Sequence, residues 1–156
     1  AMGLFFGGDY STESNIEQTT ISYIDIATTG SLAMFGDLSA PRDRMVGGFA
    51  SSTRGGVMGG QGADNSTNVD IIEYVLFSTK GKATDFGNLT SATDNISSTS
   101  NSTRGLAAGG VVSSNTDTIE YITIASAGNA TDFGDYATGN AFGSSMACSN
   151  GHGGLG

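Results

Sequence analysis

The stretch TIEYITIASAGNATDFGDY (Thr118–Tyr136) decides the fold, because two close variants of it stand earlier in the chain. These variants are TISYIDIATTGSLAMFGDL (Thr20–Leu38) and IIEYVLFSTKGKATDFGNL (Ile71–Leu89). Their shared aromatic positions recur at intervals of 74 − 23 = 51 and 121 − 74 = 47 residues: Tyr23, Tyr74 and Tyr121, followed by Phe35, Phe86 and Phe133. A period of roughly 50 residues with β-type sequence predicts a repeat architecture.

Each repeat also carries a short apolar stretch that closes with two glycines. The pairs are Gly7 and Gly8, Gly59 and Gly60, and Gly109 and Gly110. A polar loop follows, then the strand with the tyrosine, a glycine turn, the strand with the phenylalanine, and a strand of small residues. Both faces of the tyrosine strand are apolar except for a glutamate, which is typical of a strand covered on both sides. We therefore expect four short strands per unit, the pattern of a propeller blade. The whole chain, 1–156, is then one domain of three units, approximately 3–54, 55–104 and 105–153.

The charge balance excludes several classes of partner. The 156 residues carry a net charge of −9 and only six basic side chains, which form no cluster in the sequence. A nucleic acid or an anionic membrane surface would therefore find no electrostatic attraction, and no apolar run has the length of a membrane span. We expect neither partner.

The units resemble kelch repeats, in a divergent form. The glycine pairs, Tyr23, Tyr74 and Tyr121 match the kelch pattern, while Phe35, Phe86 and Phe133 stand where kelch repeats usually have Trp. Pro41 and Arg42 match a further kelch element in one unit only. The stretches ATDFGNL (83–89) and ATDFGDY (130–136) are similar to repeats of marine phage tail-fibre-like and metagenomic proteins. The resemblance implies an all-β, β-propeller fold with three four-stranded blades, and its rim loops as partner-binding surfaces.

Three blades cannot close a ring, since known propellers have typically 4–8 blades. The sequence begins at a second strand and ends just after a first strand, Phe142–Ser149, so the outer blades are out of phase with the chain ends. We predict a C2 homodimer that forms one six-bladed ring, in which each C-terminal strand completes the other copy's N-terminal blade in trans. A trimer of nine blades is the less favoured alternative.

Few residues have the pattern of a chemical site. His152 is the only histidine and Cys148 the only cysteine; by their alignment with the other units we expect a polar turn and a packed inner strand, not catalysis. No zinc or calcium ligand pattern is present, so we expect no metal and no cofactor. Tyr10 is a candidate for ligand contact because it lies in a long loop of one unit and has no equivalent aromatic in the others. Arg42 and Arg44 are further candidates because they lie in the loop that enters the next blade, and the kelch resemblance implies that such loops share a partner-binding rim.

These observations favour a non-enzymatic, self-assembling module for binding or structure, with contact to a glycan or surface receptor as the suggested role. A virion-associated or extracellular location would suit that role. An engineered or truncated repeat fragment that acts only as an assembly scaffold is the first alternative. A propeller enzyme of the glycosidase or oxidase kind is the second, and it lacks an arginine cluster and metal-binding histidines.

Overall fold

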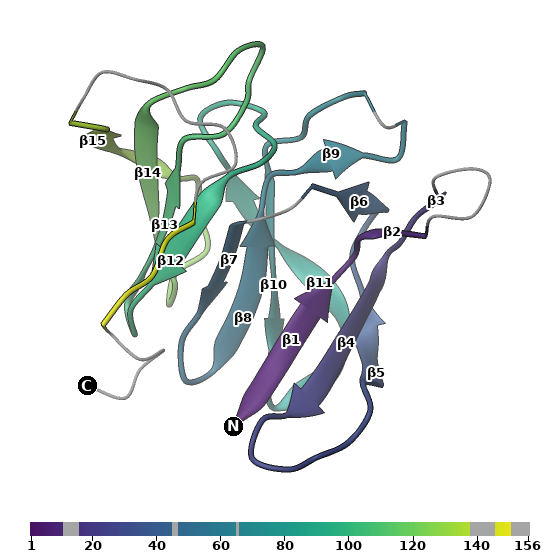
Figure 1. Cartoon of the computed structure of the whole chain (residues 1–156). Helices are drawn as coiled ribbons and strands as arrows, with labels where there is room; N and C mark the ends of the chain where they lie inside the picture. The colour runs from purple at the N-terminus through teal and green to yellow at the C-terminus, as the bar shows by residue number, and fades with distance from the viewer. Residues whose placement is uncertain (11–15, 45–46, 65, 138–145, 151–156) are drawn as a thin grey trace.

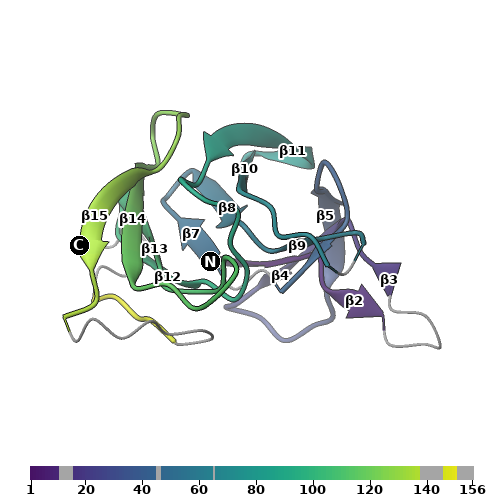
Figure 2. The same ribbon diagram turned by 90° about the horizontal axis from the view of Figure 1, so that it is seen from above.

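A computed structural model of the chain describes residues 1–10, 16–44, 47–64, 66–137 and 146–150. These residues form fifteen strands and no helix. Three antiparallel sheets, stacked face to face, make up the body of the molecule, and Figure 2 shows them spread as a fan when viewed from above. We call them sheets 1, 2 and 3 in chain order. No helix in the described part of the chain is long and apolar enough to cross a membrane.

Sheet 1 has three strands in the order β1-β4-β5, so β1 is a free edge. Its strands are β1 (Met2–Phe6), β4 (Thr20–Asp25) and β5 (Ala33–Asp37). Sheet 2 has four strands in the order β7-β8-β10-β11: β7 (Gly47–Ala50), β8 (Arg54–Met58), β10 (Ile71–Leu76) and β11 (Thr79–Asn88). Sheet 3 has the same order with β12 (Ser97–Ser100), β13 (Arg104–Ala108), β14 (Thr118–Thr123) and β15 (Thr131–Asp135).

Two short ribbons lie at one end of the sheets, which we call the rim (Figure 1). One pairs β2 (Asp9–Tyr10) with β3 (Ile16–Glu17), and the other pairs β6 (Arg42–Asp43) with β9 (Gln61–Gly62). The tight hairpin between β7 and β8 lies at the opposite end (Figure 1). The rim therefore gathers the loops that differ most between the units.

The glycine pairs turn the chain sharply at the rim. The first and second glycines of the three pairs have φ of 52–64° and 98–107°, values that L side chains rarely adopt. The amide of the first glycine donates to the strand that bears the tyrosine: Gly7 to the Thr20 carbonyl, Gly59 to that of Ile71, and Gly109 to that of Thr118. The glycine pair therefore has the same backbone contact in each of the three sheets.

Apolar residues fill the two spaces between the sheets. Ile21, Phe35, Leu38, Val57, Val75 and Ala83 pack between sheets 1 and 2. Phe49, Met58, Ile72, Phe86, Leu89, Ile96, Ala107, Ile122 and Ile124 pack mainly between sheets 2 and 3. In each sheet the tyrosine meets the phenylalanine edge-on, with ring centroids 5.7–6.1 Å apart. Sheet 2 is thus covered on both faces, as its apolar strand pattern predicts.

The strand pattern differs from the expectation of three four-stranded blades in one respect. Sheets 2 and 3 have four strands each, but sheet 1 has three, because no strand of the described residues pairs with the free edge of β1. The strand predicted over Phe142–Ser149 falls partly outside the described residues. Met146–Ser149, which are described, form no strand in the single chain.

Candidate functional site

Arg42 is a structural residue and not a ligand contact, so the sequence prediction for it was wrong. Its side chain is 1% exposed and forms an ion pair with Glu73 of β10, which is equally buried. The guanidinium also donates to the carbonyls of Gly59 (3.2 Å) and Ile71 (3.0 Å). The second carboxylate oxygen of Glu73 accepts from the Ser39 amide at 3.0 Å. The pair therefore ties the loop after sheet 1 to the rim end of sheet 2.

Arg44 and Tyr10 lie on the same rim. The Arg44 side chain is 53% exposed, with Asp43 and Asp94 carboxylate oxygens 3.9 Å from its nitrogens, and its backbone has a φ of 47°. Tyr10 belongs to β2, where it is the register partner of Ile16, and its side chain lies outside the described residues. Of the three candidates, Arg44 is the one whose described side chain is open to a ligand.

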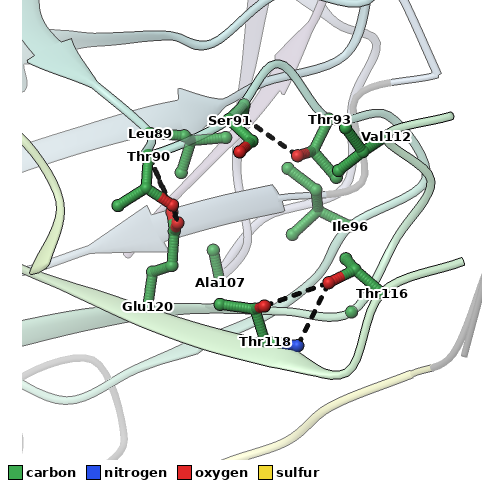
Figure 3. A pocket seen from close by; sticks show the side chains of 11 residues that line it. Leu89, Thr90, Ser91, Thr93, Ile96, Ala107, Val112, Thr116, Thr118 and Glu120 are labelled. Atoms are coloured by element: carbon green, nitrogen blue, oxygen red, sulfur yellow. Dashed lines mark hydrogen bonds between the residues drawn. The ribbon is translucent and has the colours of Figure 1, made fainter. Parts of the chain in front are cut away.

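A second buried glutamate occupies the equivalent place in sheet 3. Glu120 of β14 is 7% exposed and accepts hydrogen bonds from the Thr90 amide, at 3.2 and 3.3 Å to its two oxygens, and from the Thr90 hydroxyl. Figure 3 shows this carboxylate at one side of a cavity of about 40 Å³. Other parts of its wall are formed by Leu89, Thr93, Ile96, Ala107, Thr116 and Thr118.

The electrostatic settings of the two glutamates differ. Burial lowers the pKa of Arg42, while the charge and hydrogen bond of Glu73 act in the opposite direction. Burial raises the pKa of Glu120; the Thr90 amide opposes that rise, and the charge of Asp132 adds to it. The first carboxylate has a buried cation beside it. The second accepts hydrogen bonds from the neutral amide and hydroxyl of Thr90, so its charge is less well compensated.

The outer faces of sheets 1 and 3 expose large apolar side chains. Phe133 is 55% exposed, whereas the equivalent Phe35 and Phe86 are each 3% exposed. Phe5 is 54% exposed, whereas the equivalent Val57 and Ala107 are each 4% exposed. Ile26 (68%) and Leu32 (52%) belong to the same face of sheet 1 as Phe5. Positions that are buried between sheets elsewhere in the chain are therefore bare on its two outer faces.

A groove of about 390 Å³ lies beside the free edge of β1. Alternate residues of β1, namely Met2, Leu4 and Phe6, line one side of it, and Gly48, Phe49 and Ala50 of β7 line another. Ser149 also reaches its wall. In sheet 2 the corresponding edge, that of β8, is covered by β7. In sheet 1 no strand of the described residues covers the edge of β1 in this way.

The remaining sequence candidates do not form a site. Cys148 is exposed, so the expectation that it packs was wrong for the single chain, where Met146–Ser149 form no strand. His152 lies outside the described residues. Among the described residues, no three His, Cys, Asp or Glu side chains are grouped to hold a metal ion.

The comparisons support the fold. No protein-family model and no curated protein matches the sequence. Among solved structures, one titled "Structure of YjhT" superposes with a TM-score of 0.71 over 91% of this chain, at 10% sequence identity. The alignment covers 51% of that structure, so the chain spans about half its length. The similarity and the stacked antiparallel sheets define an all-β, β-propeller-like fold.

Sequence reasoning missed the two buried glutamates as a related pair. The signal was present, because Glu73 and Glu120 are the charged residues in otherwise apolar strands and both precede the repeated tyrosine. A buried carboxylate needs a partner, and the aligned loop position holds Arg42 in one unit and Thr93 in the next. Reading those two positions together would have placed Arg42 in the interior.

Proposed function

We propose that the chain is a self-assembling β-propeller module in which sheets 1, 2 and 3 are three blades and two copies close a six-bladed ring. A two-fold axis would relate the copies, so that the outer face of sheet 3 in each copy covers the outer face of sheet 1 in the other. The ring would then contain two identical interfaces. A structure that matches this chain over about half its own length is consistent with a complete ring of twice this size.

The exposure of Phe133 is the observation that carries this proposal. Its ring makes the same edge-on contact with Tyr121 that Phe35 and Phe86 make with their tyrosines, at 6.1 Å between centroids. Only a following sheet distinguishes the buried rings from the exposed one. A second copy would supply that sheet, with Phe5, Ile26 and Leu32 on its surface. Apolar faces of this kind are typical of a permanent interface.

Glycines of the sheet interfaces support the same arrangement. A Cβ on Gly36 would lie 1.7 Å from the carbonyl oxygen of Gly81 in the next sheet, and a Cβ on Gly87 would lie 2.3 Å from that of Gly128. Gly134 is the equivalent of Gly36 and Gly87, and Gly30 is the equivalent of Gly81 and Gly128. Neither Gly134 nor Gly30 would place a Cβ within 4 Å of another group. Close backbone contact between Gly134 of one copy and Gly30 of the other would complete the series.

The groove beside β1 suits a strand supplied in trans. By sequence alignment, residues 145–148 are the counterparts of Gly47–Ala50 of β7 and Ser97–Ser100 of β12. In the chain, β7 and β12 are joined where the Ser98 hydroxyl donates to the Gly48 carbonyl (2.8 Å) and the Ala50 amide donates to the Ser100 hydroxyl (3.1 Å). A strand on the free edge of β1 would lie next to β7 in the same way.

Paramagnetic labelling of Cys148, the one cysteine of the chain, tests strand completion in trans. A nitroxide is attached to unlabelled chains, which are mixed with ¹⁵N-labelled Cys148→Ser chains. The proposal predicts broadening of the amide signals of β1 in the labelled chains, which carry no nitroxide. The same label reduced to its diamagnetic hydroxylamine is the control. If β1 broadens only when the label and the isotope are on the same chain, the strand is completed within the chain and the proposal is wrong.

The biochemical role that we propose for the ring is non-enzymatic binding or structure, with a glycan or a surface receptor as the ligand of the rim. Arg44 is the described candidate for such contact. A glycan array tests this role, with the wild type compared with Arg44→Ala. Saturable binding to defined glycans that the substitution weakens would support the role, and the absence of binding would favour a pure assembly scaffold. Sugar hydrolysis by the purified chain would favour a propeller glycosidase.

A further inference from the structure

Two equivalent places in the molecule, one at each boundary between sheets, have different contents. The carbonyl of Arg42 accepts from the second glycine of the first pair, Gly8, and that of Thr93 accepts from Gly60 in the same way. Arg42 and Thr93 are therefore equivalent in the backbone. Glu73 and Glu120 are equivalent too, because each accepts from the amide that follows the buried leucine, Ser39 and Thr90 respectively.

At the first boundary the guanidinium of Arg42 fills this place. It bonds to a carboxylate and to two carbonyls, those of Gly59 and Ile71. At the second boundary Thr93 has a short side chain, and its hydroxyl donates to the Ser91 carbonyl at 2.9 Å instead. The cavity of about 40 Å³ lies there, lined by Thr93, Glu120, Gly109 and Thr118, and the last two are the equivalents of Gly59 and Ile71.

The cavity has the size, the charge and the access that a small cation needs. A cavity needs about 10–15 Å³ to hold one water, so this cavity has room for a group of a few heavy atoms. Glu120 brings a buried carboxylate, and no Lys or Arg is among the lining residues. Thr90, Ser91 and Val112 line the cavity and are themselves exposed, which gives a route of entry from the rim.

We propose that this cavity binds a small guanidinium cation, which takes the place that Arg42 occupies at the preceding boundary. The cation would donate to the Glu120 carboxylate and to the carbonyls of Gly109 and Thr118. Planar guanidinium groups suit such a site, because they present several N–H donors in fixed directions to a carboxylate. The site lies between sheets 2 and 3 of one chain, so it does not depend on the closure of a ring.

Titration with methylguanidinium chloride, followed by ¹⁵N NMR at constant ionic strength, tests this proposal. We expect saturable shifts of the amide signals of Thr90, Gly109 and Thr118. Thr93→Arg is the decisive variant, because its own guanidinium would fill the cavity, and we expect it to abolish the saturable shifts. Glu120→Gln removes a charge-assisted bond and should weaken binding by at least about tenfold. Sodium chloride and tetramethylammonium chloride are the matched controls.

A sister site can be created as a positive control. Arg42→Ala opens the first boundary beside Glu73, and methylguanidinium should raise the melting temperature of that variant more than that of the wild type. If Arg42→Ala does not fold, the titrations of the wild type and of Thr93→Arg still decide the question. Shifts that do not saturate, equal shifts with sodium, or unchanged binding in Thr93→Arg would each overturn the proposal.

Discussion

Replacement of Phe133 by Ser should separate the copies of the proposed ring with a modest effect on the fold of each chain. The ring of Phe133 is 55% exposed in the chain and would reach about 3% if it were covered as Phe35 and Phe86 are. A Phe buries roughly 150–250 Å² in full, so a second copy would cover about 100 Å² of this side chain. At about 25 cal/mol per Å² that area is worth ~2.5 kcal/mol per interface.

The two-fold symmetry doubles the effect, because a closed ring has two copies of the interface. Phe133→Ser should therefore weaken association by ~5 kcal/mol, which is a rise of more than about a thousandfold in the dissociation constant. About 90 Å² of the Phe133 side chain is already buried within the chain, so the loss of chain stability should be about 2 kcal/mol. Sedimentation velocity across a concentration series measures the association, and circular dichroism measures the fold.

Met34→Ser is the matched control for this experiment. Met34 is 63% exposed, but its equivalents Asp85 and Asp132 are also exposed, and Asp85 lies in a sheet that is covered on both faces. A second copy should therefore leave Met34 in solvent, and its replacement should not change the association. The reasoning is refuted if Phe133→Ser associates as tightly as the wild type, or if Met34→Ser weakens association equally.

Three further predictions concern the buried charges and the glycine contacts. Glu73→Gln should destabilise the chain by about 3–5 kcal/mol in urea unfolding, because it leaves the buried Arg42 without its counter-ion, whereas Glu120→Gln should be neutral or stabilising at pH 7. Burial raises the folded-state pKa of Glu120 above its ordinary value of 4.5, so this group should lower stability as the pH rises from about 4.5 through the folded pKa. Glu120→Gln should remove that part of the pH dependence, and an unchanged profile would contradict the assignment. Gly36→Ala should prevent normal packing of sheets 1 and 2, whereas Gly134→Ala should fold at a cost of about 1 kcal/mol for its φ of 138° and weaken association at least about tenfold. Thermal melts and sedimentation check this pair, and equal effects of both substitutions on folding would count against a trans contact at Gly134.

Much of the architecture could be predicted from the sequence, because the repeats make each position visible more than once. The tyrosine, the phenylalanine and the glycine pair recur in register, and each has one structural role in every sheet. Because the three repeats must align with one another, each of them fixes the strand positions of the other two.

The interior position of Arg42 does not follow from its own loop alone; it follows only when Thr93 and the aligned glutamates, Glu73 and Glu120, are considered with it. Loops usually lie on the surface, and a charged residue in a loop is usually exposed. Here the glutamate of the next sheet supplies a buried counter-charge, so the arginine lies in the interior. Cys148 shows the opposite error: the repeat pattern predicts a packed inner strand, but Met146–Ser149 form no strand in the single chain and Cys148 is exposed.

The mass of the chain in solution at micromolar concentration tests the central claim most directly. Two copies of the 15.7 kDa chain in a closed ring should give a mass of twice 15.7, or 31.4 kDa, that holds on tenfold dilution. A well-folded species of 15.7 kDa at that concentration would contradict the account, because the outer faces of sheets 1 and 3 would then be stable in water without a second copy.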